Sequence, residues 1–359
     1  MKTILVPMLL VLLSSITSAT DDEFTVWGYL PEYRLGGFNY EAAFQTGMTH
    51  LIYFSLEIDV KTGVPSALDR LPSKEQAKEA RIAADKVGGK IILSLGGNAR
   101  SEGFPTAAKT KHSRKKFLKA LDKILREYQF DGVDYNWEYP RNDVEWRQWG
   151  QLLRESKEYL LRPDQTEPSE AINPEAAAAQ GKAREKAKSR ENYENNIVTF
   201  TMYLDPNHYD VIIKYNLLKD ADYVHCMAYD QHGAHSTMEF AERGIQLAKS
   251  KKFNLKKFTL GVPFYARHID NGEPKTWYDL VDAMQGKPET QDALDRYYFN
   301  NKATIRKKTK LAAEENIGGI MIWEIGQDKQ PMDHPTSLMT ALNEAAAPYL
   351  KRNLKKDEL

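Results

Sequence analysis

The stretch DGVDYNWEYP, residues 131–140, decides both the fold and the chemistry that this sequence predicts. Residues two apart on a strand share a face, so Asp134, Asn136 and Glu138 point to one side and the residues between them to the other. Polar side chains in a barrel or sheet interior are costly to bury without a function. A structural hydrogen-bond ladder is the alternative interpretation. We interpret this polar face as a candidate active site.

Seven further runs of apolar, β-branched or aromatic residues accompany this stretch, and helical patterns separate most of them. The eight runs begin at residues 24, 49, 90, 130, 196, 221, 258 and 318. This alternation indicates βα units and a parallel sheet. No glycine-rich phosphate turn follows the first run, so a closed barrel fits better than an open doubly wound sheet. The predicted fold class is α/β, a (β/α)8 TIM barrel with Glu138 at the rim where barrel enzymes build their active sites.

The chain length is compatible with two domains, but α/β barrels often use such a length for one. We expect a single barrel over residues 20–350. The polar, alanine-rich segment 163–195 breaks the rhythm, and we interpret it as a surface insertion. The connection 268–317 contains a seventh helix and is too short for a large α+β insertion domain.

Both ends of the sequence resemble targeting signals. Residues 1–19 combine Lys2, an apolar stretch and small residues, which is the pattern of a signal peptide. A hydrophobic first helix is the alternative. The tail 351–359 ends in Lys-Asp-Glu-Leu, a signal that the KDEL retrieval receptor reads. Together they predict residence in the lumen of the endoplasmic reticulum.

The composition excludes several classes of partner. The chain has 50 basic and 50 acidic residues, and this balance gives no reason to expect a nucleic-acid partner. The apolar stretch near the start is too short to span a membrane. Cys226 is the only cysteine, so no intrachain disulfide can form. We predict no metal site and no cofactor.

The stretch at residues 131–140 resembles the signature of family 18 glycoside hydrolases, the chitinases and endo-β-N-acetylglucosaminidases, whose pattern is Asp-x-x-Asp-x-Asp-x-Glu on the fourth barrel strand. Other stretches resemble the same family at the third, sixth, seventh and eighth strands. They are SLGG at 94–97, MAYDQHG at 227–233, GVPFYAR at 261–267 and GGIMIWEIGQD at 318–328. Several motifs in order on the expected strands make a chance match improbable.

The resemblance implies substrate-assisted, retaining hydrolysis. Glu138 would protonate the glycosidic oxygen, and the N-acetyl oxygen of the sugar would attack the anomeric carbon to form an oxazolinium ion. The substrate would be a β-1,4-linked N-acetylglucosamine chain, either a chitooligosaccharide or the chitobiose core of an N-glycan. The implied catalytic residues are Asp134, Asn136, Glu138 and Tyr229. The implied substrate-binding residues are Tyr29, Phe54, Gly97, Tyr139, Met227, Asp230 and Trp323.

Three other residues receive structural roles. Ser94 and Asp131 are expected to support the site from beneath. Cys226 alternates with Met227 and Tyr229, so it should face away from the site and pack in the core.

Asn136 departs from the family pattern, which has an aspartate at this position. An amide keeps a hydrogen bond to the acetamido N–H but cannot balance the positive charge of the oxazolinium ion, a loss of about 3–4 kcal/mol. It should also lower the pKa of Glu138 relative to an aspartate. An Asn-x-Glu pair does work in family 85 endo-β-N-acetylglucosaminidases. Two hypotheses therefore stay open: a slowed or retuned hydrolase, and a non-hydrolytic lectin of the lumen.

Overall fold

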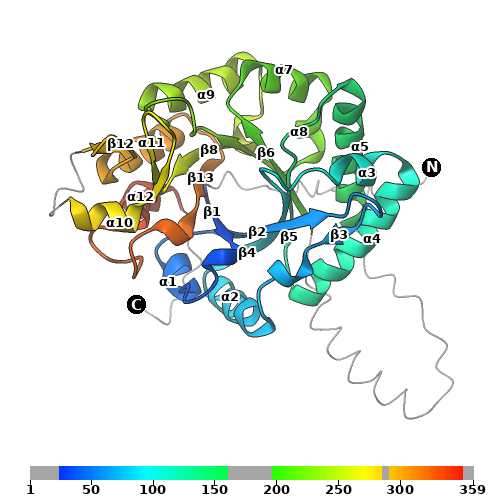
Figure 1. Ribbon diagram of the computed structural model, residues 1–359, viewed down its shortest axis with the longest axis horizontal. Coiled ribbons are helices and arrows are strands. Elements are labelled where there is room, and N and C mark those ends of the chain that lie inside the picture. Colours follow the sequence, from blue (N-terminus) through cyan, green and yellow to red (C-terminus); the bar gives the residue numbers. More distant parts are fainter. Residues whose placement is uncertain (1–23, 161–195, 285–290, 351–359) are drawn as a thin grey trace, which may run out of the picture.

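The computed structural model describes residues 24–160, 196–284 and 291–350, and its eight parallel strands close into a barrel. Closure follows from β1, which pairs in parallel with both β13 and β2. Helices surround the strands (Figure 1). The predicted (β/α)8 barrel is confirmed. The barrel strands are β1 (Thr25–Pro31), β2 (His50–Ile58), β4 (Lys90–Gly96), β5 (Gly132–Asn136), β6 (Ile197–Tyr203), β7 (Tyr223–Met227), β8 (Phe258–Pro263) and β13 (Gly319–Trp323).

The helices of the described residues follow the amphipathic patterns of the sequence. Helix α2, for example, begins after a capping box formed by Ser73 and Gln76 and ends at Gly88, whose φ of 72° suits glycine. The helices are α1 (Tyr40–Gln45), α2 (Lys74–Val87), α3 (Phe104–Ala108), α4 (Lys111–Tyr128), α5 (Asp143–Leu160), α7 (Pro206–Lys214), α8 (Leu217–Asp220), α9 (Met238–Ser250), α10 (Trp277–Ala283), α11 (Lys302–Glu314) and α12 (Leu338–Ala346).

Strand β5 divides its side chains between two environments, as the alternation predicts. The hydroxyl of Tyr135 lies 2.8 Å from that of Ser156 on α5, and the ring of Trp137 stacks on Phe104 of α3. The buried side chain of Asp134 instead bonds to residues of other barrel strands. The polar face of β5 therefore points into the barrel interior, and the helices cover the apolar face of the strand.

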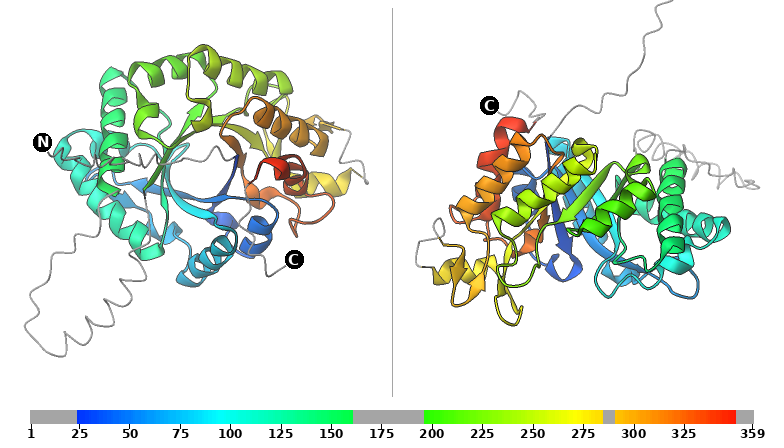
Figure 2. Two further views of the ribbon diagram at one scale, coloured as in Figure 1. Left: turned by 180° about the vertical axis from the view of Figure 1, so that it is seen from behind. Right: turned by 90° about the horizontal axis from the view of Figure 1, so that it is seen from above.

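A second, antiparallel sheet follows the seventh barrel strand, and the sequence analysis did not predict it. It has the order β10-β9-β12-β11, and β9 begins directly after β8. Its strands have two to four residues, too few for a period-two pattern to be visible. The sheet lies at the carboxyl end of the barrel, in yellow in the right view of Figure 2. The strands are β9 (Tyr265–His268), β10 (Pro274–Thr276), β11 (Ala293–Leu294) and β12 (Tyr297–Tyr298). The remaining short strand, β3 (Pro65–Ser66), pairs antiparallel with the end of β2.

Several predictions concern parts of the chain outside the described residues. The signal peptide at 1–19, the insertion at 163–195 and the tail at 351–359 are among them, so they stay predictions. Within the described ranges, none of the helices has both the length and the apolar character needed to cross a bilayer. The same ranges hold no group of three His, Cys, Asp or Glu side chains suited to a metal ion.

Candidate active site

Asp134 lies at the centre of a hydroxyl network inside the barrel. Its carboxylate accepts hydrogen bonds from the hydroxyls of Tyr29 at 2.9 Å, Ser94 at 2.9 Å and Thr199 at 2.8 Å. Burial raises the pKa of Asp134, while these three donors favour its charged form. The predicted support by Ser94 is thus a direct contact. Because the donors come from three other strands, Asp134 ties β5 to β1, β4 and β6.

Asn136 occupies the next inward position, one step nearer the carboxyl end of β5. Its side-chain oxygen accepts a hydrogen bond from the hydroxyl of Thr201 on β6. Its backbone carbonyl accepts from the amide of Gly97 at 2.7 Å and from the hydroxyl of Ser101 at 3.1 Å. One lone pair of Oδ1 is therefore occupied, and only the other is left for the acetamido N–H that the sequence analysis assigned to this residue.

Glu138 follows β5 and is partly buried at the rim. Burial raises the pKa of its carboxyl to about 7, and the charge of Asp230 contributes to the rise. A hydrogen bond with the side chain of Asn136 acts in the opposite direction and lowers this pKa. Burial nevertheless outweighs the amide, so a large share of Glu138 is protonated at neutral pH. The backbone amide of Glu138 is held by the hydroxyl of Ser101 at 3.0 Å.

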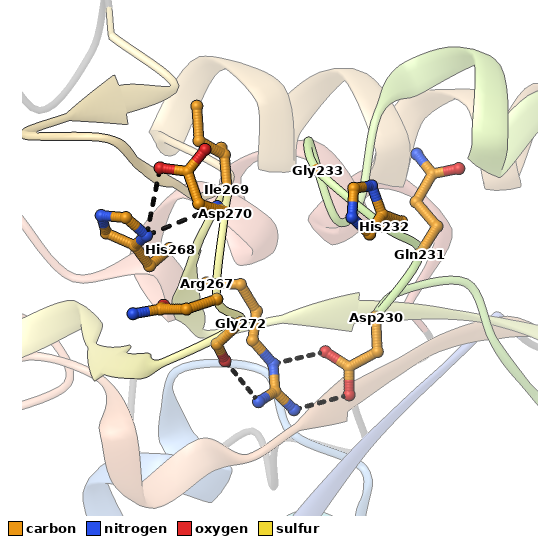
Figure 3. A pocket seen from close by; sticks show the side chains of 10 residues that line it. Asp230, Gln231, His232, Gly233, Arg267, His268, Ile269, Asp270 and Gly272 are labelled. Atoms are coloured by element: carbon orange, nitrogen blue, oxygen red, sulfur yellow. Dashed lines mark hydrogen bonds and ion pairs between the residues drawn. The ribbon is translucent and has the colours of Figure 1, made fainter.

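Asp230 is fixed by a two-pronged ion pair. Arg267 on β9 donates from Nε and Nη2 to the two carboxylate oxygens, each at 2.9 Å (Figure 3). The hydroxyl of Tyr265 donates to Oδ1 at 2.6 Å, and Nδ1 of His235 lies 3.6 Å from the same oxygen. Burial alone would raise the pKa of Asp230, but these three neighbours hold it well below its usual range. Asp230 is thus a permanent negative charge near Glu138.

Tyr229 precedes Asp230 and is almost fully buried. Its hydroxyl lies 3.7 Å from the sulfur of Met321 on β13. Burial, together with the charges of Asp230 and Glu138, raises the pKa of Tyr229 far above its usual value. The phenol is therefore protonated at any physiological pH and is available as a donor. Met227 and Tyr229 pack in the same apolar cluster of the barrel interior.

Aromatic rings line the rim around these groups. Trp323, at the end of β13, meets Phe54 edge to face with ring centres 4.7 Å apart, and its ring centre lies 5.6 Å from that of Tyr29. Tyr139 lies next to Glu138 and contacts His208. Trp323 and Tyr139 are partly exposed, and such aromatic faces suit the apolar C–H faces of sugars. The structure thus gathers the predicted aromatic residues at one end of the barrel.

Close packing against Phe54 requires a glycine at position 97. Its φ is 106°, and an added Cβ would lie 2.4 Å from the ring of Phe54. The residue makes room for this ring, and its amide holds the carbonyl of Asn136.

Two of the predicted structural residues lie away from the site. Asp131 precedes β5 at the opposite end of the strand, where it pairs with Arg81. Cys226 is fully buried and has the hydroxyl of Tyr209 at 3.5 Å, so it packs outside the barrel interior. Both agree with the structural roles expected from the sequence.

The sequence analysis missed several residues that contact the site, namely Ser101, Thr199, Thr201, His235, Tyr265 and Arg267. The threonines alternate along β6, and this pattern could have indicated an inward hydroxyl face. Tyr265 and Arg267 belong to the small sheet, and only the fold brings them to Asp230. A cavity of about 330 Å³ lies beside the ion pair of Asp230 and Arg267, between the loop after β7 and the β9–β10 hairpin, as Figure 3 shows.

Comparisons with known proteins identify the family of this chain. The family model described as "Glycosyl hydrolases family 18" matches residues 25–328. Endochitinase 1 of Metarhizium anisopliae is 23% identical over 310 residues, which cover 74% of this chain and 67% of that protein. A class V chitinase of Arabidopsis thaliana is 30% identical over 287 residues, which cover 67% of this chain and 69% of that protein. The chain thus spans about two thirds of the length of these relatives.

Solved structures show the same fold. The chitinase ChiB of Flavobacterium johnsoniae superposes with a TM-score of 0.67 at 21% identity, covering 91% of this chain and 94% of that one. A mutant class V chitinase of Nicotiana tobaccum in complex with NAG4 superposes with a TM-score of 0.66 at 16% identity, covering 90% and 99%. Because the family model matches most of the sequence and the fold agrees, this chain belongs to the family 18 glycosyl hydrolases.

Proposed function

We propose that the chain hydrolyses β-1,4-linked N-acetylglucosamine by substrate-assisted, retaining catalysis, with Glu138 as the acid and base. The observation that carries this proposal is the position of Glu138, a partly buried carboxyl at the carboxyl end of β5 beside Asn136 and Asp230, where burial raises its pKa to about 7. A carboxyl group with such a pKa can deliver a proton at neutral pH and take one back in the next step. The family membership of the chain supports the same chemistry.

The remaining groups fit the later steps of this reaction. Glu138 protonates the glycosidic oxygen while the acetamido oxygen of the sugar attacks the anomeric carbon, which releases the leaving sugar and forms an oxazolinium ion. Water then opens this ion, and Glu138 accepts the proton. Tyr229 is a protonated donor suited to the acetamido oxygen. Trp323 and Tyr139 offer ring faces to the sugar, and Asp230 borders it.

Asn136 is the reason to expect a slowed or retuned enzyme. The amide carries no charge that could balance the oxazolinium ion, and Thr201 already bonds to its oxygen. Preorganised charges aimed at a developing charge commonly supply most of the rate enhancement. We therefore expect turnover below that of a variant with a carboxylate at this position.

The experiment is a turnover assay with two substrate classes. The mature chain is incubated with chitooligosaccharides and, separately, with a glycopeptide that carries a chitobiose core, beside the Glu138→Gln variant. Product above the level of this variant supports hydrolysis, and the class that yields product identifies the substrate. No product with either class, at protein concentrations that bind the sugars, would refute the proposal.

The second candidate function is a non-hydrolytic lectin for N-acetylglucosamine glycans. Asn136 favours it, because the loss of the charge impairs catalysis but leaves the aromatic cleft intact. Sugar binding without turnover above the Glu138→Gln variant would support the lectin.

The chitobiose core is the preferred substrate if the protein resides in the lumen of the endoplasmic reticulum. That location is proposed from residues 1–19 and the C-terminal Lys-Asp-Glu-Leu. A fluorescent fusion that keeps both ends, compared with one that lacks the last four residues, tests it. Loss of retention in the shorter fusion is the expected result.

A further inference from the structure

Lys308 on α11 is a buried cation that the chemistry above does not use. Its side chain is 0% exposed, and Nζ donates three hydrogen bonds: to the carbonyl of Ser236 at 2.8 Å, to the hydroxyl of Ser236 at 2.8 Å and to the side-chain oxygen of Asn300 at 2.7 Å. All three acceptors are neutral. Within the described ranges no carboxylate forms an ion pair with Nζ. A buried ammonium group with no counter-charge is costly, so its retention points to a role.

The acceptors of Lys308 belong to the segment that carries part of the candidate active site. The hydroxyl of Ser236 connects Lys308 to Ala228, because it accepts from Lys308 and donates to the carbonyl of Ala228 at 2.8 Å. Asn300 also donates to the carbonyl of Ser236, at 2.7 Å. A turn closed by the amide of Gln231 and the carbonyl of His235 lies between these points. Lys308 therefore braces both ends of segment 228–236.

The conformation of this segment needs such a brace. Asp230 has a backbone φ of 62°, a value that residues other than glycine rarely adopt. The same residue must meet Arg267 with both carboxylate oxygens, and Tyr229 precedes it directly. A small shift of segment 228–236 would therefore displace two groups of the site at once.

We propose that Lys308 is a positioning residue of the candidate active site, whose ammonium group holds segment 228–236 in place through Ser236. The number of hydrogen bonds supports this assignment. An ammonium group has three donors for three acceptors, whereas a neutral amine has two donors and a lone pair that would face the third acceptor. The effect of Lys308 on catalysis rests on the proposed function, but its effect on the order of the segment does not.

The charge of Lys308 is open to titration. Burial lowers its pKa to about 7, although the charges of Asp292 and Glu239 oppose this shift. His235, the remaining titratable group that senses Lys308, has its own pKa lowered, chiefly by burial. The ammonium form prevails below about pH 7 and is lost as the pH rises through that value. The brace should therefore weaken in mildly alkaline solution.

Hydrogen–deuterium exchange of the full chain tests this proposal without reference to turnover. Lys308→Met is compared with Lys307→Met, which changes an exposed lysine of the same helix. We expect faster exchange in Lys308→Met that is confined to peptides covering residues 228–236, and a difference from wild type that shrinks above about pH 7. Exchange equal to that of Lys307→Met, or raised equally over all peptides, would overturn the proposal.

A turnover assay with the same variants connects the brace to catalysis. We expect kcat to fall about tenfold to a hundredfold in Lys308→Met with a smaller change in KM, because displaced groups act mainly on the transition state. If wild type shows no turnover, the proposed function fails and the exchange result alone decides the role of Lys308. If Lys308→Met does not fold, Ser236→Ala decides: faster exchange at residues 228–231 supports the brace, and unchanged exchange refutes it.

Discussion

The two ends of strand β5 carry carboxylates with opposite environments. Asp131, before the strand, accepts from Arg81 at 2.7 Å and from the amide of Ile91 at 2.7 Å, and Lys90 lies 3.8 Å away. Glu138, after the strand, has no ion-pair partner among the described residues, and its charged neighbour Asp230 repels its ionised form. The end with paired charges serves stability, and the end with an unpaired acid can exchange protons.

The largest expected effect is the loss of turnover in Glu138→Gln. The amide is nearly isosteric but cannot transfer a proton, so kcat should fall about 10²- to 10⁴-fold. Sugar binding and the midpoint of thermal unfolding should change little, because Glu138 has no ion pair to lose. Steady-state kinetics and a thermal melt check both parts, and turnover within a few-fold of wild type would contradict the assignment.

The second largest expected effect is a loss of stability in Arg81→Leu. Removal of the guanidinium leaves Asp131 buried without its main partner, which should lower the free energy of unfolding by about 3–5 kcal/mol. Burial raises the pKa of Asp131 and Arg81 opposes this shift, so the loss of Arg81 raises the folded-state pKa further, and the damage should be larger at about pH 7 than at about pH 4. Urea titrations at the two pH values measure this. Equal losses at both would show that the ion pair is not the cause.

Asn136→Asp should raise kcat about a hundredfold, because a carboxylate restores the charge opposite the oxazolinium ion. Thr201 can donate to the new carboxylate as it does to the amide. The additional charge should also raise the pKa of Glu138. Kinetics with chitooligosaccharides provide the measurement. A fall in kcat would instead mean that the amide has a catalytic role of its own.

The pH profile of wild type follows from the same carboxyl group. Because Glu138 must be protonated to act as the acid and its pKa is about 7, kcat/KM should fall about tenfold for each unit of pH above this value. Initial rates measured across the pH range test this. A profile that stays flat well beyond neutral pH would contradict the raised pKa.

The smallest effect is expected for Lys90→Leu. Lys90 faces the same carboxylate as Arg81, but its side chain is 44% exposed and its nitrogen is 3.8 Å away. Exposed pairs of this kind contribute less than about 1 kcal/mol. Urea unfolding beside Arg81→Leu compares the two partners of Asp131 directly. A loss as large as that of Arg81→Leu would remove the distinction between them.

The sequence predicted the barrel because strand runs and amphipathic helices are local patterns. It also placed Asp134 and Asn136 on one inward face, since alternation along one strand requires no knowledge of the neighbours. The contacts of Thr199 and Thr201 depend on the register between β5 and β6, which sequence does not state. Arg267 reaches Asp230 from a small sheet whose strands are too short to show a period-two pattern in the sequence. The pKa of Glu138 depends on burial, which only the assembled rim determines.

The hydrogen bond between Tyr29 and Asp134 has a consequence for cleft depth. Strands β1 and β5 are not neighbours in the barrel, so this 2.9 Å hydrogen bond crosses the barrel interior from one strand to the other. Both side chains are almost completely buried. A ligand that enters from the carboxyl end would have to break this hydrogen bond to reach deeper into the barrel. Groups above this level, namely the strand-end residues such as Trp323 and the loops that frame the opening, should therefore discriminate between sugars, and loop exchange is a practical route to a new specificity.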